Sequence, residues 1–316
     1  MELIRNKQTA SLIILLCFLS IIAVGVISVR KNKAIAVMCQ SMREDLRKST
    51  LGDVLSDISG QSVYVKNMTT GDEYVSKNSK TIRPLASLTK LMTVRTVLRQ
   101  NNNTEAKYTL TETDTAPYGT MMGIESGSEF RIKDLMLASL VASSNDSAEA
   151  LMYSTGIQTA SSFYEAMKKE SRDNDWQSFD FSGVTGLDFE EKPTALGNAE
   201  DVASLLYKNI TEYPDTFIFP QTELSIRSTT GNIVTLQPTN EAIPSLPLLV
   251  AGKTGYTVSA GGNLAILWRH PLAQETYISA VVLGSTFSGR FYDIVKLYTS
   301  VNSFLEYEHS LSEICK

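Results

Sequence analysis

Cysteine and histidine are scarce in this sequence, which has three cysteines and two histidines among its 316 residues. Cys17 lies within a hydrophobic run, while Cys39 and Cys315 lie at opposite ends of the rest of the chain, so they indicate no disulfide framework. Pairing of Cys39 with Cys315 would require an oxidising compartment, and the sequence leaves it open. With only His270 and His309, a zinc peptidase is poorly supported, and we expect no metal or other cofactor.

An excess of positive charge is also missing. The 29 lysines and arginines are outnumbered by 34 aspartates and glutamates, which gives a formal net charge of -5. Because the basic residues are scattered among acids and form no stripe, nucleic acid is not expected as a partner. The chain has no internal repeats and no low-complexity linker, and its 43% of hydrophobic residues can form a full core. These properties predict one globular domain of moderate size with an appendage.

The appendage is a run of about twenty residues without charge, Ala10 to Val29, which is long enough to span a bilayer. We predict that residues 1–33 form a short tip and an uncleaved transmembrane anchor. The alternative is a secreted protein whose signal peptide is cleaved after Ala34-Ile35-Ala36, but the basic cluster just before that site is unfavourable. Basic residues after the span outnumber those before it, which by the positive-inside bias keeps that side cytoplasmic, although long domains are translocated despite such charges.

Hydrophobic periodicity after the anchor predicts a mixed α+β fold. Residues 34–58 have the spacing of a helical connector broken near Thr50 to Gly52, and Ser62 to Val75 has the pattern of a β-hairpin. The further predicted elements are helices at Arg131–Val141, Ala148–Tyr153, Ala160–Glu170, Ala199–Ile210 (capped by Asn198) and Arg290–Leu305, and strands at Glu223–Arg227, Ile233–Leu236, Leu246–Val250, Gly262–Trp268 and Thr276–Leu283. This order predicts an antiparallel sheet built from both chain ends, with packed helices and an inserted helical subdomain. The domain would comprise residues 59–308, followed by a C-terminal tail at 309–316.

A serine and a lysine three positions apart, Ser87 and Lys90, stand at the start of an apolar-periodic run in the stretch Pro84 to Thr93. At the start of a helix, these two side chains share one face. A serine hydroxyl becomes an effective nucleophile when a base takes its proton, and a lysine can be that base when burial or nearby cations lower its pKa. Alone the pattern is weak, because it equally fits a serine cap followed by a surface lysine, and Ser28 and Lys31 repeat the spacing.

Two further short motifs follow in the chain. Ser143-Ser144-Asn145 lies between two predicted helices, and Lys253-Thr254-Gly255 follows a predicted strand. An edge strand with a lysine and a hydroxyl could hold an anionic substrate, and its glycine lets another backbone approach closely. Either motif alone fits an ordinary loop or strand end. Ser143 follows Ser87 by 56 residues, and Lys253 follows Ser143 by 110 residues. The three motifs together, in this order, are typical of β-lactamases and penicillin-binding proteins.

With these motifs, the chain resembles the serine D-alanyl-D-alanine carboxypeptidases, which are penicillin-binding proteins of low molecular mass. The resemblance extends from about Val63 to Leu305. It rests on the local sequences Pro84–Thr93, Met122-Gly123, Ser143–Ser147, Gly186-Leu187-Asp188 and Lys253–Thr257 with Ala260-Gly261. It implies a β-lactamase/penicillin-binding-protein-like fold, a part in peptidoglycan metabolism and cell shape, and a bacterial cell membrane location with the catalytic domain outside the cytoplasm.

The resemblance also implies a role for each catalytic residue. Ser87 would be acylated by the penultimate D-alanine carbonyl of a peptidoglycan stem peptide, which releases the terminal D-alanine, and water would then free the enzyme. Lys90 would be the base for acylation. Ser143 would relay protons toward the leaving nitrogen, and Asn145 would hold Lys90 and the substrate amide.

Substrate binding is implied for the third motif. Lys253 and Thr254, with Gly255 beside them, would place the terminal carboxylate of the substrate. The backbone amides of Ser87 and Tyr256 would form an oxyanion hole, in which each amide can contribute a few kcal/mol to stabilising the transition state. β-Lactam antibiotics are implied as covalent inhibitors.

Some positions depart from the family pattern. Ser144 stands where many relatives have glycine, and the Asn-Pro that often precedes Gly186-Leu187 is missing. Position 285 is serine, close to where some relatives have an arginine that helps bind the carboxylate, and we leave Arg290 outside the predicted site. The extra β-domain and C-terminal amphipathic anchor of many relatives are also missing, so the N-terminal span would take over the anchoring.

Three alternative functions stay open at this point. A D,D-endopeptidase that cuts peptidoglycan cross-links would use the same residues. A serine β-lactamase would need fast deacylation, usually through a glutamate in a Glu-x-x-Leu-Asn stretch, and the sequence lacks that stretch between its second and third motifs. A non-catalytic wall-binding module is disfavoured, because such a module has no need of the five intact residues Ser87, Lys90, Ser143, Asn145 and Lys253.

Overall fold

The computed structural model describes residues 33–315, apart from 102, 117, 124 and 219–221. The chain divides into two compact units, one of residues 53–302 and one that combines residues 1–52 with 303–316. The span predicted at Ala10 to Val29 lies outside the described residues. In the described part of the chain, no helix combines the length and the hydrophobicity that a membrane crossing requires.

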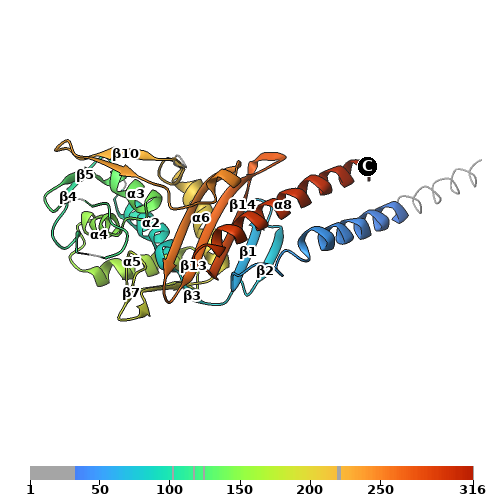
Figure 1. Cartoon of the computed structure of the whole chain (residues 1–316), viewed down its shortest axis with the longest axis horizontal. Coiled ribbons are helices and arrows are strands. Elements are labelled where there is room, and N and C mark those ends of the chain that lie inside the picture. The colour runs from blue at the N-terminus through green and yellow to red at the C-terminus, as the bar shows by residue number, and fades with distance from the viewer. Residues whose placement is uncertain (1–32, 102, 117, 124, 219–221, 316) are drawn as a thin grey trace, which may run out of the picture. The chain divides into compact units, whose positions relative to one another are not determined.

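The larger unit is built on a five-stranded antiparallel sheet with the strand order β12-β13-β14-β1-β2 (Figure 1). Its strands are β1 (Ser62–Asn67), β2 (Glu73–Lys77), β12 (Leu249–Thr257), β13 (Gly261–His270) and β14 (Ala273–Ser285). β1 pairs with β14, so that Ser62 faces Leu283 and Asn67 faces Ile278. Both ends of the chain therefore contribute to one sheet, and the predicted α+β class with an antiparallel sheet is confirmed.

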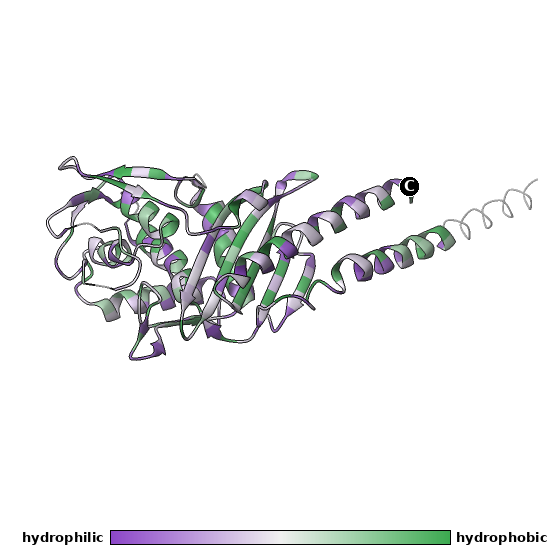
Figure 2. Cartoon of the chain, in the orientation of Figure 1, coloured by the Kyte–Doolittle hydropathy of each residue, from purple (hydrophilic) through white to green (hydrophobic). Residues whose placement is uncertain are grey.

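The two faces of the sheet pack against different helices because side chains alternate along each strand. On one face, Trp268 of β13 contacts Tyr298 of α8 (Gly289–Ile314), with ring centroids 5.3 Å apart, and donates a 3.0 Å hydrogen bond to Asn302. On the other face, Tyr277 of β14 packs on Tyr207 of α6 (Ala199–Glu212). Figure 2 shows how hydrophobic residues concentrate on these central strands.

The inserted helical part lies on the α6 side of the sheet, and its helices share the main hydrophobic core with that face. It consists of η1 (Ala86–Thr89), α2 (Lys90–Gln100), α3 (Ile132–Val141), α4 (Asn145–Ser154), α5 (Ala160–Asp173), α7 (Pro214–Phe217) and η2 (Ile243–Ser245). Hydroxyl and amide side chains cap several helices, and Asn198 accepts a hydrogen bond from the Asp201 amide, as its predicted capping role requires.

Short strand pairs complete the larger unit. They are β3 (Arg83–Pro84) and β6 (Asp180–Phe181) on either side of β9 (Ala195–Gly197), β4 (Lys107–Thr109) with β5 (Glu129–Arg131), β7 (Asp188–Phe189) with β8 (Lys192–Pro193), and β10 (Leu224–Arg227) with β11 (Ile233–Leu236). The β10–β11 hairpin agrees with the strands predicted at Glu223–Arg227 and Ile233–Leu236.

Two elements extend farthest beyond their predicted ends. The strand predicted to end at Val250 continues to Thr257, because β12 stays paired with β13 as far as the Thr257–Gly261 pair. The closing helix predicted to end at Leu305 continues to Ile314. In the smaller unit, residues 33–51 are helical, and a disulfide that the sequence left open joins Cys39 to Cys315 just after the end of α8.

Candidate active site

Ser87 lies in η1, the single tight turn before α2, and β13 holds this turn in place. The side-chain nitrogen of Asn263 donates to the carbonyl oxygens of Pro84 and Leu85, each at 3.0 Å. Its side-chain oxygen accepts a 2.8 Å hydrogen bond from the Gly284 amide of β14. The buried amide of Asn263 therefore ties the backbone just before Ser87 to two strands of the sheet.

Two glycines let other segments approach the Ser87 turn closely. A Cβ on Gly186 would lie 1.9 Å from the carbonyl oxygen of Ala86. A Cβ on Gly255 would lie 2.9 Å from the Leu85 carbonyl oxygen and 3.1 Å from the Ser87 nitrogen. Ala86 itself has a φ of +48°, a left-handed conformation that costs a non-glycine residue about 1 kcal/mol. The segments around η1 thus hold a strained residue immediately before the serine.

Lys90 begins α2, and its buried amino group donates to three acceptors. These are Ser87 Oγ at 2.8 Å, Asn145 Oδ1 at 2.8 Å and the carbonyl oxygen of Thr185 at 2.9 Å. Burial lowers the pKa of Lys90 to about 7, although the negative charges of Glu149 and Asp146 act in the opposite direction. Near neutral pH a substantial fraction of Lys90 is therefore an uncharged amine, whose lone pair can accept the proton of Ser87.

Asn145 connects Lys90 to a neighbouring loop. It is the first residue of α4, which Ser144 caps by accepting from the Ser147 amide. While its Oδ1 accepts from Lys90, its Nδ2 donates to the carbonyl oxygen of Tyr118 at 2.6 Å. These two contacts fix which way the amide points, with its oxygen toward the lysine.

Ser143 and Lys253 form a second hydroxyl–amine pair. Lys253 Nζ donates to Ser143 Oγ at 2.8 Å and to the carbonyl oxygen of Thr254 at 3.0 Å. Burial holds the pKa of Lys253 well below its ordinary value, and the positive charges of Lys90 and Arg290 lower it further. Ser143 has a φ of +58°, so it is a second non-glycine residue in the left-handed region at this site.

The rest of the third motif lies on the edge strand β12. The hydroxyl groups of Thr254 and Thr239 are 2.6 Å apart. Arg290 of α8 is buried and donates a 2.7 Å hydrogen bond to the Gly255 carbonyl oxygen. Tyr256 is exposed, and its ring packs edge-on against Phe287 with centroids 5.0 Å apart.

The structure thus brings the sequence-predicted residues together as two pairs, Ser87 with Lys90 and Ser143 with Lys253, with Asn145 bonded to Lys90. Thr254, Gly255 and Tyr256 follow Lys253 on β12, with Gly255 against the Ser87 turn. The catalytic and binding roles given to these residues remain predictions.

Sequence reasoning missed three contributors to the site. The Thr185 carbonyl is a backbone acceptor, which no residue type signals. Glu149 lies four residues after Asn145, so helical spacing could have placed it on the Asn145 side of α4. Arg290 was left outside the predicted site, yet it donates to the Gly255 carbonyl and lowers the pKa of Lys253.

Comparison with known proteins gives a consistent result. The peptidase family S11, described as D-alanyl-D-alanine carboxypeptidase, matches residues 48–286. The D-alanyl-D-alanine carboxypeptidase DacF of Bacillus subtilis is 27% identical over 199 residues, which are 60% of this chain and 49% of that protein. The match therefore spans about half the length of that relative. A D-alanyl-D-alanine endopeptidase of Haemophilus influenzae is 26% identical over 238 residues, 72% of this chain and 76% of that protein.

Solved structures agree with this fold. Penicillin-binding protein D2 from Listeria monocytogenes, in its cefotaxime-bound form, superposes with a TM-score of 0.65 at 25% identity, covering 77% of this chain and 97% of the other. A D-alanyl-D-alanine carboxypeptidase from Mycobacterium tuberculosis superposes with a TM-score of 0.70 at 17% identity, covering 78% of this chain and 92% of the other.

Proposed function

The chain belongs to the D-alanyl-D-alanine carboxypeptidase family, and we propose that it removes the terminal D-alanine from peptidoglycan stem peptides through an acyl-enzyme on Ser87. The observation that carries this proposal is the 2.8 Å contact between Lys90 Nζ and Ser87 Oγ. Because the pKa of Lys90 is about 7, the base is available at neutral pH without help from a metal or histidine.

Acylation begins with transfer of the Ser87 proton to neutral Lys90, while Ser87 Oγ attacks the carbonyl carbon of the penultimate D-alanine. The oxyanion that forms is stabilised by the backbone amides of Ser87 and Tyr256. As the C–N bond breaks, the proton that Lys90 took up passes through Ser143, which Lys253 orients, to the leaving amine of the terminal D-alanine, so that Lys90 becomes neutral again. Water then attacks the ester, which releases the shortened peptide and restores the Ser87 hydroxyl.

The terminal carboxylate is bound by Lys253 and Thr254. A bound carboxylate favours the ammonium form of Lys253, because it places a negative charge beside this buried amine. Arg290, through its contact with the Gly255 carbonyl, adds positive charge on the same strand. The site is therefore suited to a peptide with a free C-terminus.

A second candidate, a D,D-endopeptidase that cuts cross-links, is supported by relatives of that description from Haemophilus influenzae and Pseudomonas aeruginosa, each 26% identical to this chain. A β-lactamase is less well supported, since the chain lacks a Glu-x-x-Leu-Asn stretch between its second and third motifs and slow hydrolysis of acylated penicillin is expected. The presence of all five residues of the three motifs disfavours a non-catalytic wall-binding module.

We place the catalytic domain outside the cytoplasm of a bacterium, anchored by Ala10 to Val29. The anchor rests on the sequence, because the span lies outside the described residues. The Cys39–Cys315 disulfide supports an extracytoplasmic location, since such bonds persist in oxidising compartments. Secretion after signal-peptide cleavage is the alternative.

The proposal is tested by incubating the full chain, in detergent, with a fluorescent penicillin. A stable covalent label is expected on the wild type and none on Ser87→Ala, whose folding is checked by circular dichroism. Absence of label on the wild type would contradict the acyl-enzyme, and rapid loss of label would indicate a β-lactamase. Release of D-alanine from a pentapeptide, compared with splitting of a cross-linked dimer, then distinguishes carboxypeptidase from endopeptidase.

A further inference from the structure

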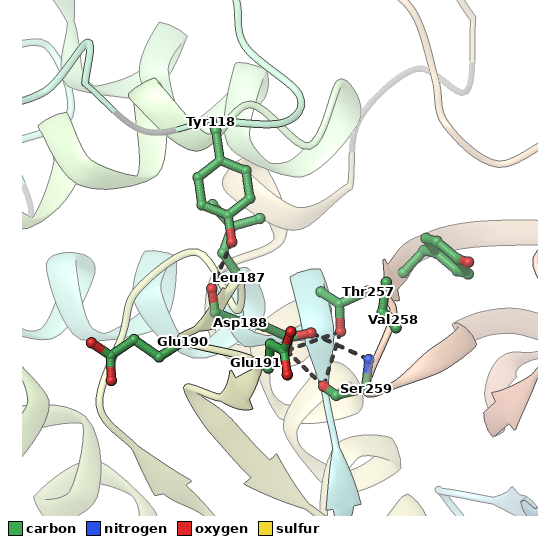
Figure 3. A pocket seen from close by; sticks show the side chains of 9 residues that line it. Tyr118, Leu187, Asp188, Glu190, Glu191, Thr257, Val258 and Ser259 are labelled. Carbon is green, nitrogen blue, oxygen red and sulfur yellow. Dashed lines mark hydrogen bonds between the residues drawn. The ribbon is translucent and has the colours of Figure 1, made fainter.

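A groove of about 670 Å³ adjoins the catalytic residues (Figure 3). It is lined by Tyr118, by Leu187, Asp188, Glu190 and Glu191 of one loop, and by Tyr256–Ser259 at the end of β12 and just after it. Tyr118 joins the groove to the site, because its carbonyl oxygen accepts from Asn145. On the opposite wall, Tyr256 directly follows Gly255 on the strand that reaches the Ser87 turn.

The direction of a bound peptide follows from the proposed function, on which this inference rests. With its carboxylate at Lys253 and its scissile carbonyl near the Tyr256 amide, a peptide runs antiparallel to β12. β12 is an edge strand, and such an edge accepts an extended peptide as an added strand. At about 3.3 Å per residue, the residue that precedes D-alanyl-D-alanine lies beside Thr257 and Val258, where the groove begins.

The wall of this groove is held in place by Asp188. Its carboxylate accepts hydrogen bonds from the Ser259 hydroxyl at 2.6 Å, the Thr257 hydroxyl at 3.1 Å and the Ser259 amide at 3.2 Å. The Tyr118 hydroxyl donates to the Asp188 carbonyl oxygen at 2.6 Å, from the other side of the groove. These contacts, drawn in Figure 3, leave Asp188 with little capacity to bind a ligand, so its role is to fix the loop.

The two glutamates that follow Asp188 remain free to bind. Glu190 and Glu191 are exposed and form the turn between β7 and β8, both with positive φ. Among the described residues, no hydrogen bond or ion pair engages their carboxylates. Of the nine lining residues, three are acidic and none is basic, so the groove favours a cation. The opposite wall offers two large exposed side chains with apolar surface, Val258 (93% exposed) and Tyr256 (47% exposed).

We propose that this groove receives the side chain of the residue preceding D-alanyl-D-alanine, and that Glu190 and Glu191 select a side chain ending in a free primary ammonium. The methylene stem of such a chain packs on Tyr256 and Val258, while its charged end is attracted by the negative charge that Glu190 and Glu191 place on the opposite wall. Acylation itself needs neither glutamate, so they determine which peptides bind well and leave the chemistry unchanged.

The test compares Nα-acetyl-L-lysyl-D-alanyl-D-alanine with the same peptide acetylated at Nε, using the full chain in detergent and measuring D-alanine release. The wild type should prefer the free amine. In the double variant Glu190→Gln/Glu191→Gln, the ratio of kcat/KM for the free-amine peptide to that for the acetylated peptide should fall about five-fold. The fall should come mainly from a higher KM for the free-amine peptide, as expected for two exposed ion pairs. Raising the salt from 0.05 to about 0.5 M should reduce the wild-type preference in the same direction.

The matched control is Asp72→Asn/Glu275→Gln, which removes the same charge at the other end of the sheet, from the position before β2 and from the start of β14. It should keep the wild-type preference and label with fluorescent penicillin at the wild-type rate. An unchanged preference in the groove variant, or an equal loss in the control, would overturn the inference. A wild type that cleaves both peptides equally overturns only the inference, whereas one that cleaves neither and takes no label overturns the proposed function as well.

Discussion

Lys90 owes its lowered pKa, and so its uncharged fraction near neutral pH, to its surroundings. An ammonium group buried at this site loses its hydration, and three hydrogen-bond acceptors replace only part of it. Burial therefore dominates and lowers the pKa of Lys90 to about 7, while Glu149 and Asp146 raise it by their charges. The pKa of Glu149 is itself raised to about 7, by burial first and by the charge of Asp114 second. The two groups consequently titrate in the same range of pH.

Because Glu149 favours the charged form of Lys90, the variant Glu149→Gln is expected to lower the pKa of Lys90. The rate of acylation by penicillin rises with pH as Lys90 loses its proton, so this acid limb should move to lower pH. At pH 6 the rate should rise about two-fold, a small change because Glu149, whose pKa is about 7, is already mostly protonated there, and the plateau above pH 8 should stay within about two-fold. Stopped-flow labelling between pH 5 and 9 measures both.

Glu275→Gln provides the control for this experiment. Glu275 is exposed and lies near the start of β14, at the far end of that strand from Ser285. Its removal changes the net charge by the same amount and should leave the acid limb in place. A limb that does not move in Glu149→Gln, or that moves to higher pH, would show that Lys90 is not the group that titrates.

At the scale of elements, the Ser87 turn depends on close backbone approach. Gly186→Ala would bring a Cβ to 1.9 Å from the Ala86 carbonyl oxygen, at a position with a φ of +79°. The backbone must shift there, and the shift displaces the adjacent Thr185 carbonyl that holds Lys90. We expect the free energy of unfolding, measured by urea denaturation, to fall by about 2–4 kcal/mol. Acylation, measured by penicillin labelling, should slow about ten-fold or more.

Gly156→Ala separates the backbone effect from the collision. Gly156 has nearly the same φ, +78°, but a Cβ there would have nothing within 4 Å. Gly156→Ala should lower the free energy of unfolding by only about 1 kcal/mol and leave the acylation rate unchanged. Equal losses in the two variants would mean that the contact between Gly186 and Ala86 is unimportant for the site.

Contacts within one helical turn could be predicted from the sequence, whereas contacts between distant segments could not. Ser87 and Lys90 were predictable as a pair because one helical turn brings them together. The strand β12 was predicted too short, since Gly252 and Gly255 weaken the local strand signal while pairing with β13 carries the strand through to Thr257. Contacts to backbone carbonyls, such as Lys90 with Thr185, depend on tertiary approach and have no signature in residue type.

At the scale of the whole molecule, the sheet built from both chain ends followed from the order of predicted elements, and the pairing of β1 with β14 confirms it. The Cys39–Cys315 bond did not follow, because the two cysteines are 276 residues apart and nothing local indicates their distance. Both cysteines belong to the smaller unit, whereas Ser87, Lys90 and Lys253 belong to the unit of residues 53–302. Loss of the bond should therefore affect stability and activity differently.

Within the helix of residues 33–51, the buried side chains are those of Cys39 and Leu51, so the helix has little apolar packing apart from its disulfide. In proteins, most of a helix's stability comes from the packing of its apolar face, which this helix largely lacks. In the double variant Cys39→Ser/Cys315→Ser, amide hydrogen exchange across 33–51 should accelerate about ten-fold or more, measured by mass spectrometry. Penicillin labelling of Ser87 should stay within about two-fold of the wild type, because Ser87 and Lys90 lie in the other unit.

Cys17→Ser is the matched control, because it removes a cysteine outside the described residues and should leave exchange at 33–51 unchanged. Unchanged exchange in the double variant would mean that packing, and not the disulfide, holds this helix.

The Cys39–Cys315 bond also tests the location of the domain. Alkylation of intact cells should find Cys39 and Cys315 protected until a reductant is added, since disulfides persist in oxidising compartments. Free thiols at both positions in the cell would contradict an extracytoplasmic domain even if purified protein forms the bond in air.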